Sequence, residues 1–242
     1  MKKAYFIISL LFFCLSAINA QETEDKLPDP KPIAFVVESN QLTTDSISIS
    51  SERSLEAPVN IQFYANAPEV DGYILTCIWE FFKDGELYDS YIETDVLVEL
   101  TESGVITVKP TISYTSLEDD EEHYVWDENS PFFSIIIAES GLEAPNAFSP
   151  NGDGNHDYYN VYDVESIVEF HGAIYNRWGQ ELFRWGIDEI GNPECGWDGT
   201  YNGRQVSDGV YYVVINAKGA DGVIYEIRRD VNLLRGYTEV GK

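Results

Sequence analysis

The 242-residue chain has few cysteines, histidines and basic residues. Its three cysteines form no C-x-x-C pair, and its three histidines form no H-E-x-x-H motif. No G-x-S-x-G motif marks a nucleophilic serine. These absences argue against the common zinc sites and serine hydrolases. We therefore expect a protein that is not an enzyme. A small hydrolase built on paired carboxylates stays as an alternative hypothesis, to be tested by a substrate screen.

Basic residues are scarce beside acidic ones: 15 Lys and Arg face 42 Asp and Glu, and the net charge is −27. Such a surface repels nucleic acid and anionic lipid, so neither is an expected partner. Most of the excess acid lies before residue 146, which favours two domains. Cys77 lies in an apolar strand pattern and Cys195 in a Gly/Pro loop, so we expect two unpaired thiols.

The N-terminus has the pattern of a secretory signal peptide. Two lysines precede an apolar run from Ala4 to Leu15, and small residues follow up to Ala20, where we expect cleavage. A lipoprotein signal with a lipidated Cys14 is the rival interpretation, but the bulky Phe12 and Phe13 argue against it. The run is shorter than a membrane span, and we expect no span in the mature chain. Residues 21–32 are charged and Pro-rich, which predicts a flexible leader.

No stretch of the mature chain has the periodicity of an amphipathic helix. Instead, short runs rich in β-branched and aromatic residues follow one another between Gly, Pro and acidic clusters. The runs cover residues 46–50, 59–63, 75–82, 96–100, 105–114, 132–137, 168–175, 180–183, 210–217 and 223–234. This spacing predicts an all-β fold class, with two tandem immunoglobulin-like β-sandwich domains at 33–141 and 142–242.

Two segments of the first domain resemble the PKD and immunoglobulin-like modules of bacterial surface proteins. They are Trp79–Gly85, an aromatic strand that runs into an Asp-Gly turn, and Glu102–Val108, a glycine that leads an alternating strand. Trp79 is the predicted core residue. A binding role for this domain is one hypothesis, with Trp126, Tyr88 and Tyr91 as the candidate contacts to a glycan or a surface protein. Residues 116–129, which hold seven acids, predict a solvated loop or hairpin tip.

The C-terminal third contains four distinctive segments: Pro145–Asp157, Ile174–Phe183, Gly196–Gly203 and Asp208–Ile215. In this order they resemble the gliding motility-associated C-terminal domain, the type B sorting domain of the type IX secretion system. The resemblance implies a β-sandwich that the type IX translocon recognises, with or without a dedicated outer-membrane partner. It also implies export through the inner membrane to the cell surface or the medium. It assigns no oligomeric state.

Several residues of this domain are candidates for partner recognition. Arg177 and Trp178 precede the glycine of a predicted left-handed turn, and Trp197 and Asp198 occupy a similar place before Gly199. The pair Arg228 and Arg229 interrupts the last strand pattern and faces solvent or a partner. The alternative for the two tryptophans is a purely structural role in the sandwich.

The run from Asn151 to Asp157 offers side-chain oxygens at every second position, from Asn151, Asp153, Asn155 and Asp157. This spacing is similar to the start of D-x-D-x-D-G calcium loops. Asn at two of the positions lowers the charge, and Tyr162 stands where such loops have a glutamate. Two hypotheses follow, a weak calcium site or a rigid loop of Asx turns. We expect no other cofactor.

Overall fold

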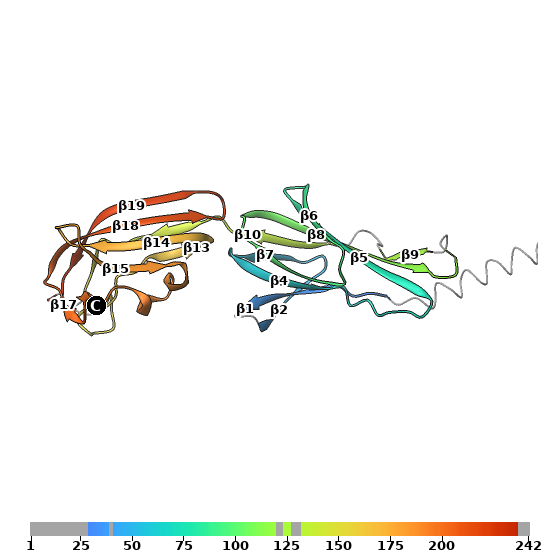
Figure 1. The fold of residues 1–242 in the computed structure, drawn as a ribbon, viewed down its shortest axis with the longest axis horizontal. Coiled ribbons are helices and arrows are strands. Elements are labelled where there is room, and N and C mark those ends of the chain that lie inside the picture. Colours follow the sequence, from blue (N-terminus) through green and yellow to red (C-terminus); the bar gives the residue numbers. More distant parts are fainter. Residues whose placement is uncertain (1–28, 39–40, 120–122, 127–131, 237–242) are drawn as a thin grey trace, which may run out of the picture. The chain divides into compact units, whose positions relative to one another are not determined.

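The computed structural model describes residues 29–38, 41–119, 123–126 and 132–236. These residues form strands and loops, with two short 3₁₀ helices, η1 (Ile187–Glu189) and η2 (Pro193–Cys195). The chain divides into two compact units, one made mainly of residues before 135 and one mainly of residues after it (Figure 1). The predicted signal peptide lies outside the described residues. Within the described part, no helix has the length and apolar character that a membrane crossing requires.

The first domain is a β-sandwich of two sheets. One sheet has the order β2–β1–β4–β7, with β2 (Gln41–Ser48), β1 (Ile33–Glu38), β4 (Val59–Tyr64) and β7 (Asp95–Leu100). The other has the order β3–β10–β8–β5–β6, with β3 (Glu52–Leu55), β10 (Phe133–Ile137), β8 (Gly104–Ser116), β5 (Tyr73–Lys83) and β6 (Glu86–Tyr91). A further strand, β9 (His123–Trp126), pairs with β8.

Aromatic rings fill the space between these two sheets. Phe63 of β4 contacts Trp79, Phe81 and Phe133 of the facing sheet, with ring centroids 5.4 to 5.6 Å apart. Trp79 is fully buried, as predicted, and its indole N–H donates to the Glu93 carbonyl at 3.0 Å. The buried indole therefore keeps a hydrogen-bond partner, which makes it a stable core residue.

The second domain is built on one five-stranded sheet of order β12–β19–β18–β14–β15. These strands are β12 (Ala147–Phe148), β19 (Ile224–Leu233), β18 (Gly209–Gly219), β14 (Ile167–Tyr175) and β15 (Glu181–Gly186). Two short pairs complete it: β11 (Gly141–Glu143) with β13 (Tyr162–Glu165), and β16 (Thr200–Tyr201) with β17 (Arg204–Gln205). Side chains of β11 and β13 share the core with those of the sheet. The predicted fold class, all-β with two sandwich domains, is confirmed.

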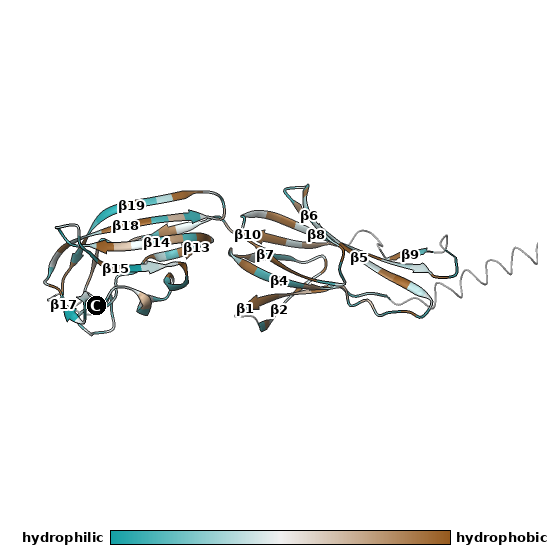
Figure 2. Ribbon diagram, in the orientation of Figure 1, coloured by the Kyte–Doolittle hydropathy of each residue, from teal (hydrophilic) through white to brown (hydrophobic). Residues whose placement is uncertain are grey.

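Strand β18 lies in the middle of this sheet, as its two apolar faces predict. Tyr211, Val213 and Ile215 alternate into the core, while Val210 and Tyr212 are exposed on the other face. Figure 2 shows this alternation of apolar and polar residues along the strands of both domains. Arg228 and Arg229 do not end β19, which continues through them to Leu233.

One prediction about a loop needs correction. Within the predicted leader, Pro30 and Pro32 are buried and the Lys31 carbonyl accepts a hydrogen bond from the Asn66 side chain, so these residues pack on the first domain. In the acidic segment 116–129, residues His123–Trp126 form strand β9, which pairs antiparallel with β8, as the predicted hairpin requires. Residues 120–122 and 127–131 of that segment lie outside the described residues.

Candidate functional site

The Asn151–Asp157 loop is held by its own side chains. The Asp157 carboxylate accepts the backbone N–H groups of Asn151 (2.9 Å) and Gly152 (2.7 Å) on one oxygen and of Gly154 (2.8 Å) on the other. Asn151 Oδ1 accepts the N–H of Asp153, and Asp153 Oδ1 accepts that of Asn155, which makes two successive Asx turns. Gly152 and Gly154 have positive φ, so the loop path suits glycine at both places.

These contacts bear on the two hypotheses for the loop. The oxygens of Asn151, Asp153 and Asp157 already accept N–H donors, so the structure contains the predicted Asx-turn loop. Among the described residues, no group of three His, Cys, Asp or Glu side chains is arranged to hold a metal. The N–H groups of Gly152 and Gly154, helped by that of Asn151, hold the pKa of Asp157 below its ordinary value. These bonds favour the Asx-turn hypothesis, and the calcium hypothesis is left to a titration.

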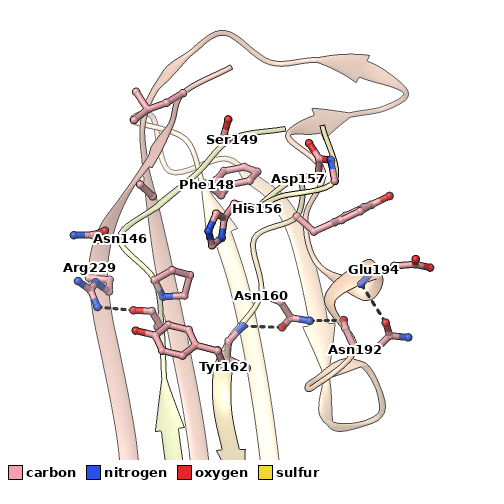
Figure 3. Close-up of a pocket in the computed structure, with 17 residues that line it drawn as sticks. Asn146, Phe148, Ser149, His156, Asp157, Asn160, Tyr162, Asn192, Glu194 and Arg229 are labelled. Atoms are coloured by element: carbon pink, nitrogen blue, oxygen red, sulfur yellow. Dashed lines mark hydrogen bonds between the residues drawn. The ribbon is translucent and has the colours of Figure 1, made fainter. Parts of the chain in front are cut away.

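An open groove of about 1090 Å³ runs beside this loop (Figure 3). The segment from Ala144 to Ser149 forms one wall, and Asn160, Asn192 and Glu194 lie along the other, with the Tyr162 ring directed toward Arg229. The Asn160 side chain donates to the Glu189 and Asn192 carbonyls at 3.1 and 2.8 Å, which fixes that wall.

The two arginines of β19 do not form one patch. Consecutive strand residues point to opposite faces, so Arg228 and Arg229 are directed to different sides of the sheet. Arg229 reaches the groove, where its guanidinium donates to the Ala144 carbonyl at 2.7 Å (Figure 3). Arg228 is exposed on the other face. The predicted basic pair is therefore two separate cations.

Trp197 is a core residue, which corrects its place among the recognition candidates. Its side chain is 0% exposed, its ring centroid lies 5.3 Å from that of Phe148 and 5.0 Å from that of Tyr211, and its indole N–H donates to the Thr200 carbonyl. A partner cannot reach it in the folded domain. Asp198 is exposed, but its carboxylate accepts the Thr200 N–H at 2.9 Å and caps the turn.

Trp178 has the opposite environment: 80% of its surface is exposed, in the turn that joins β14 to β15. The Arg177 guanidinium lies over the indole, 5.1 Å from the ring centroid, which is a cation–π contact. Gly179 adopts the predicted left-handed conformation, with φ +78°. Trp178 is therefore accessible to a partner, and Arg177 and Trp178 stay candidates for partner recognition.

The candidates of the first domain differ in their accessibility. Tyr88 is exposed on β6, an edge strand. Tyr91 is half-buried, with its ring against Phe81 and its hydroxyl donating to Asp89. Trp126 is half-buried on β9 and donates its indole N–H to the Asp29 carboxylate at 3.0 Å. Tyr88 is the most accessible of the three.

The sequence reasoning missed the groove and an exposed apolar stretch on β6. The groove is assembled from segments up to 90 residues apart, and no local pattern announces it. Leu87 and Tyr88 on β6 and Ile92, directly after it, are exposed, and Ile92 is 73% exposed. Apolar residues within the polar run from Glu86 to Asp95 were the available signal for this second feature.

The comparison with protein families identifies the C-terminal domain. Residues 142–226 match the model of the CHU_C type IX secretion signal domain. The predicted type IX sorting domain is confirmed. The match indicates export of the protein to the cell surface or the extracellular space. No curated protein matches the chain significantly.

Two solved structures are similar to the chain at low identity. Dimeric latent PorU from Porphyromonas gingivalis is 13% identical, with a TM-score of 0.25 over 88% of this chain. The chain spans only 21% of that protein's length. The fibronectin(III)-like modules of Clostridium thermocellum CbhA are 11% identical, with a TM-score of 0.22 over 78% of this chain and 93% of theirs. TM-scores this low support no functional conclusion.

Proposed function

We propose that the C-terminal domain delivers the first domain across the outer membrane by binding the type IX export machinery. The observation that carries the proposal is the match of residues 142–226 to a type IX secretion signal domain. The finer assignment to the gliding motility-associated, type B class rests on the four sequence segments. In this role the domain is recognised as a folded surface, and its side chains perform no catalysis.

A transplantation experiment tests this proposal. Residues 142–242 are fused behind a signal peptide and a fluorescent protein in a host with a working type IX system. We expect the fluorescent protein on the cell surface or in the medium, accessible to added protease. The same fusion without residues 142–242 is the control. Because upstream sequence can contribute, a second fusion starts at residue 22. Retention of both fusions in the periplasm contradicts the proposal.

For the first domain we propose an adhesin-like role, the binding of a glycan or a neighbouring surface protein. The supporting observation is that Tyr88 and Ile92 are exposed on and directly after β6, the strand at the edge of its sheet. Sheet edges are places where a strand or a partner can add, so exposed apolar side chains there favour an interaction.

The mature chain and its Tyr88→Ala variant test that role on a glycan array and on whole cells. We expect binding by the mature chain and at least a tenfold loss in the variant. Tyr212→Ala, which removes an exposed tyrosine from the other domain, is the matched control. Equal binding by all three proteins contradicts this use of β6.

A further inference from the structure

We infer that the turn Asn176–Gln180 is the anchor by which the C-terminal domain holds its export partner. Trp178 enters an apolar pocket of a partner protein, and Arg177 pairs with a carboxylate at the rim of that pocket. This inference rests on the proposed export function and adds to it the residues and the chemistry of the contact.

The four segments that distinguish this domain differ in the burial of their aromatic residues. Phe148, Trp197 and Tyr211, from three of them, meet in one buried aromatic cluster. Trp178, from the remaining segment Ile174–Phe183, is 80% exposed. Burial explains the first three residues, because they exclude water from the core. Burial does not explain Trp178, whose indole is left available for a contact with a partner.

Hydrogen bonds fix the backbone of the turn. Asn176 Oδ1 accepts the N–H groups of Trp178 (2.9 Å) and Gln180 (3.0 Å), and the Asn176 backbone carbonyl accepts that of Gly179 (2.9 Å). The Gln180 side chain donates to the Tyr201 hydroxyl at 3.1 Å, which ties the turn to β16. A side chain presented on a fixed backbone loses little entropy on binding, which raises the affinity that its contacts provide.

The turn carries an exposed positive charge. Within the described part of the chain, the Arg177 guanidinium makes no ion pair, and it stacks on Trp178 instead. A second arginine, Arg204, is exposed on β17. It is the cross-strand partner of Tyr201, whose hydroxyl accepts the hydrogen bond from Gln180. One cation on the exposed indole, and a second on the hairpin to which the turn is tied, in a chain of net charge −27, fit a partner surface that is apolar and locally acidic. Trp and Arg are also enriched among the residues that dominate protein–protein affinity.

A protein pocket suits this geometry better than a sugar. Arg177 already covers one face of the indole, so only the other face and the ring edge remain free. A pocket can contact both of these and the guanidinium together, whereas a stacked sugar uses one face only.

The test uses the full chain in a host with a working type IX system. We expect Trp178→Ala to lower the exported fraction at least tenfold, and Arg177→Glu to lower it more than Arg177→Gln. Ile224→Ala is the control, because Ile224 is exposed at the start of β19, at the end of the sheet opposite to the turn, and its variant is expected to be exported normally. Folding is checked by thermal unfolding of the purified variants. Unfolding curves equal to that of the wild type are expected, since Trp178 contributes little to the core.

A deletion of residues 142–242 separates the two claims. If the deleted chain is still exported, the proposed function of the domain fails. If the deletion stops export while folded Trp178→Ala and Arg177→Glu proteins reach the surface at wild-type levels, the anchor inference is overturned. If both variants are exported normally but cells bind a glycan less well, the turn is a sugar contact and the inference is equally overturned.

Discussion

Gly172 and Trp185 are cross-strand partners in the β14–β15 pair, and the indole of Trp185 lies directly over the glycine. A Cβ atom at position 172 would lie 2.7 Å from the ring atoms Cε2 and Cζ2. Trp185 cannot move away easily, because it is buried. Its ring centroid lies 5.7 Å from that of Phe170 and 5.6 Å from that of Phe183. The absent side chain at 172 therefore allows the tryptophan to pack flat on the sheet.

We predict that Gly172→Ala destabilises the second domain by about 1–3 kcal/mol, the usual cost of overpacking a core. Chemical denaturation of the mature chain, followed by tryptophan fluorescence, measures the change. Gly186→Ala is the matched control on the neighbouring strand. A Cβ there meets its nearest neighbour at 4.0 Å and the backbone has φ −119°, so little change is expected. Equal stability of the two variants would contradict the packing account.

Asp157 gives a prediction about acid. Three backbone N–H groups lower the pKa of its carboxyl in the folded state, so the carboxylate form stabilises the fold. This contribution is present above the ordinary aspartate pKa of about 4 and is lost as the pH falls through the lowered value. We expect Asp157→Asn to melt at a lower temperature than wild type at neutral pH.

The difference between wild type and Asp157→Asn should narrow as the pH falls below about 4, and it should vanish once the pH has passed the lowered pKa of the native carboxyl. Thermal unfolding at a series of pH values measures it. Asp188→Asn removes an exposed acid from η1 and controls for the change in net charge. A difference between the two curves that stays constant with pH would speak against the N–H contacts as its source.

For calcium we predict no specific binding by the Asn151–Asp157 loop, because its oxygens already accept hydrogen bonds within the loop. Calorimetric titration of the mature chain with millimolar calcium measures it. Because so acidic a chain attracts cations weakly over its whole surface, the Asp153→Ala variant is titrated as a control for nonspecific binding. A saturable heat that disappears in Asp153→Ala would establish the calcium site in place of the plain turn.

The two cysteines should differ in reactivity. Burial, and to a lesser degree the nearby charge of Asp95, raises the pKa of the Cys77 thiol to about 11. Cys195 is half-buried in η2. At pH 8 we expect a thiol reagent to modify one residue quickly in the native mature chain and both residues in denaturant. Cys195→Ser should abolish the fast reaction. Rapid modification of that variant would show that Cys77 is accessible.

Much of the fold was predictable because the buried strands have strong local patterns. Segments 59–63, 75–82 and 105–114 fall within β4, β5 and β8, each of which alternates buried and less buried residues. Strand β6 was missed because its sequence, Glu86–Tyr91, is largely exposed and shows no alternation. Sheet edges such as this one are specified by their neighbours more than by their own residues.

Trp178 and Trp197 show where local pattern stops being informative. Each follows a strand or loop and precedes a turn with a left-handed glycine, Gly179 or Gly199. Trp178 is exposed and Trp197 is buried. The difference arises because Tyr159, 38 residues before Trp197, exchanges two backbone hydrogen bonds with it and so fixes Trp197 against the core. Such a distant pairing cannot be read from the residues around either tryptophan.

The Asn176 side chain satisfies the backbone of its turn without help from the two residues that follow it. The identity of positions 177 and 178 is thus uncoupled from the path of the chain. On the inferred anchor role of the turn, exchange of this dipeptide redirects the protein to a different receptor and leaves the scaffold that displays it unchanged. An engineer can use the same position to graft a short address onto an otherwise unchanged carrier.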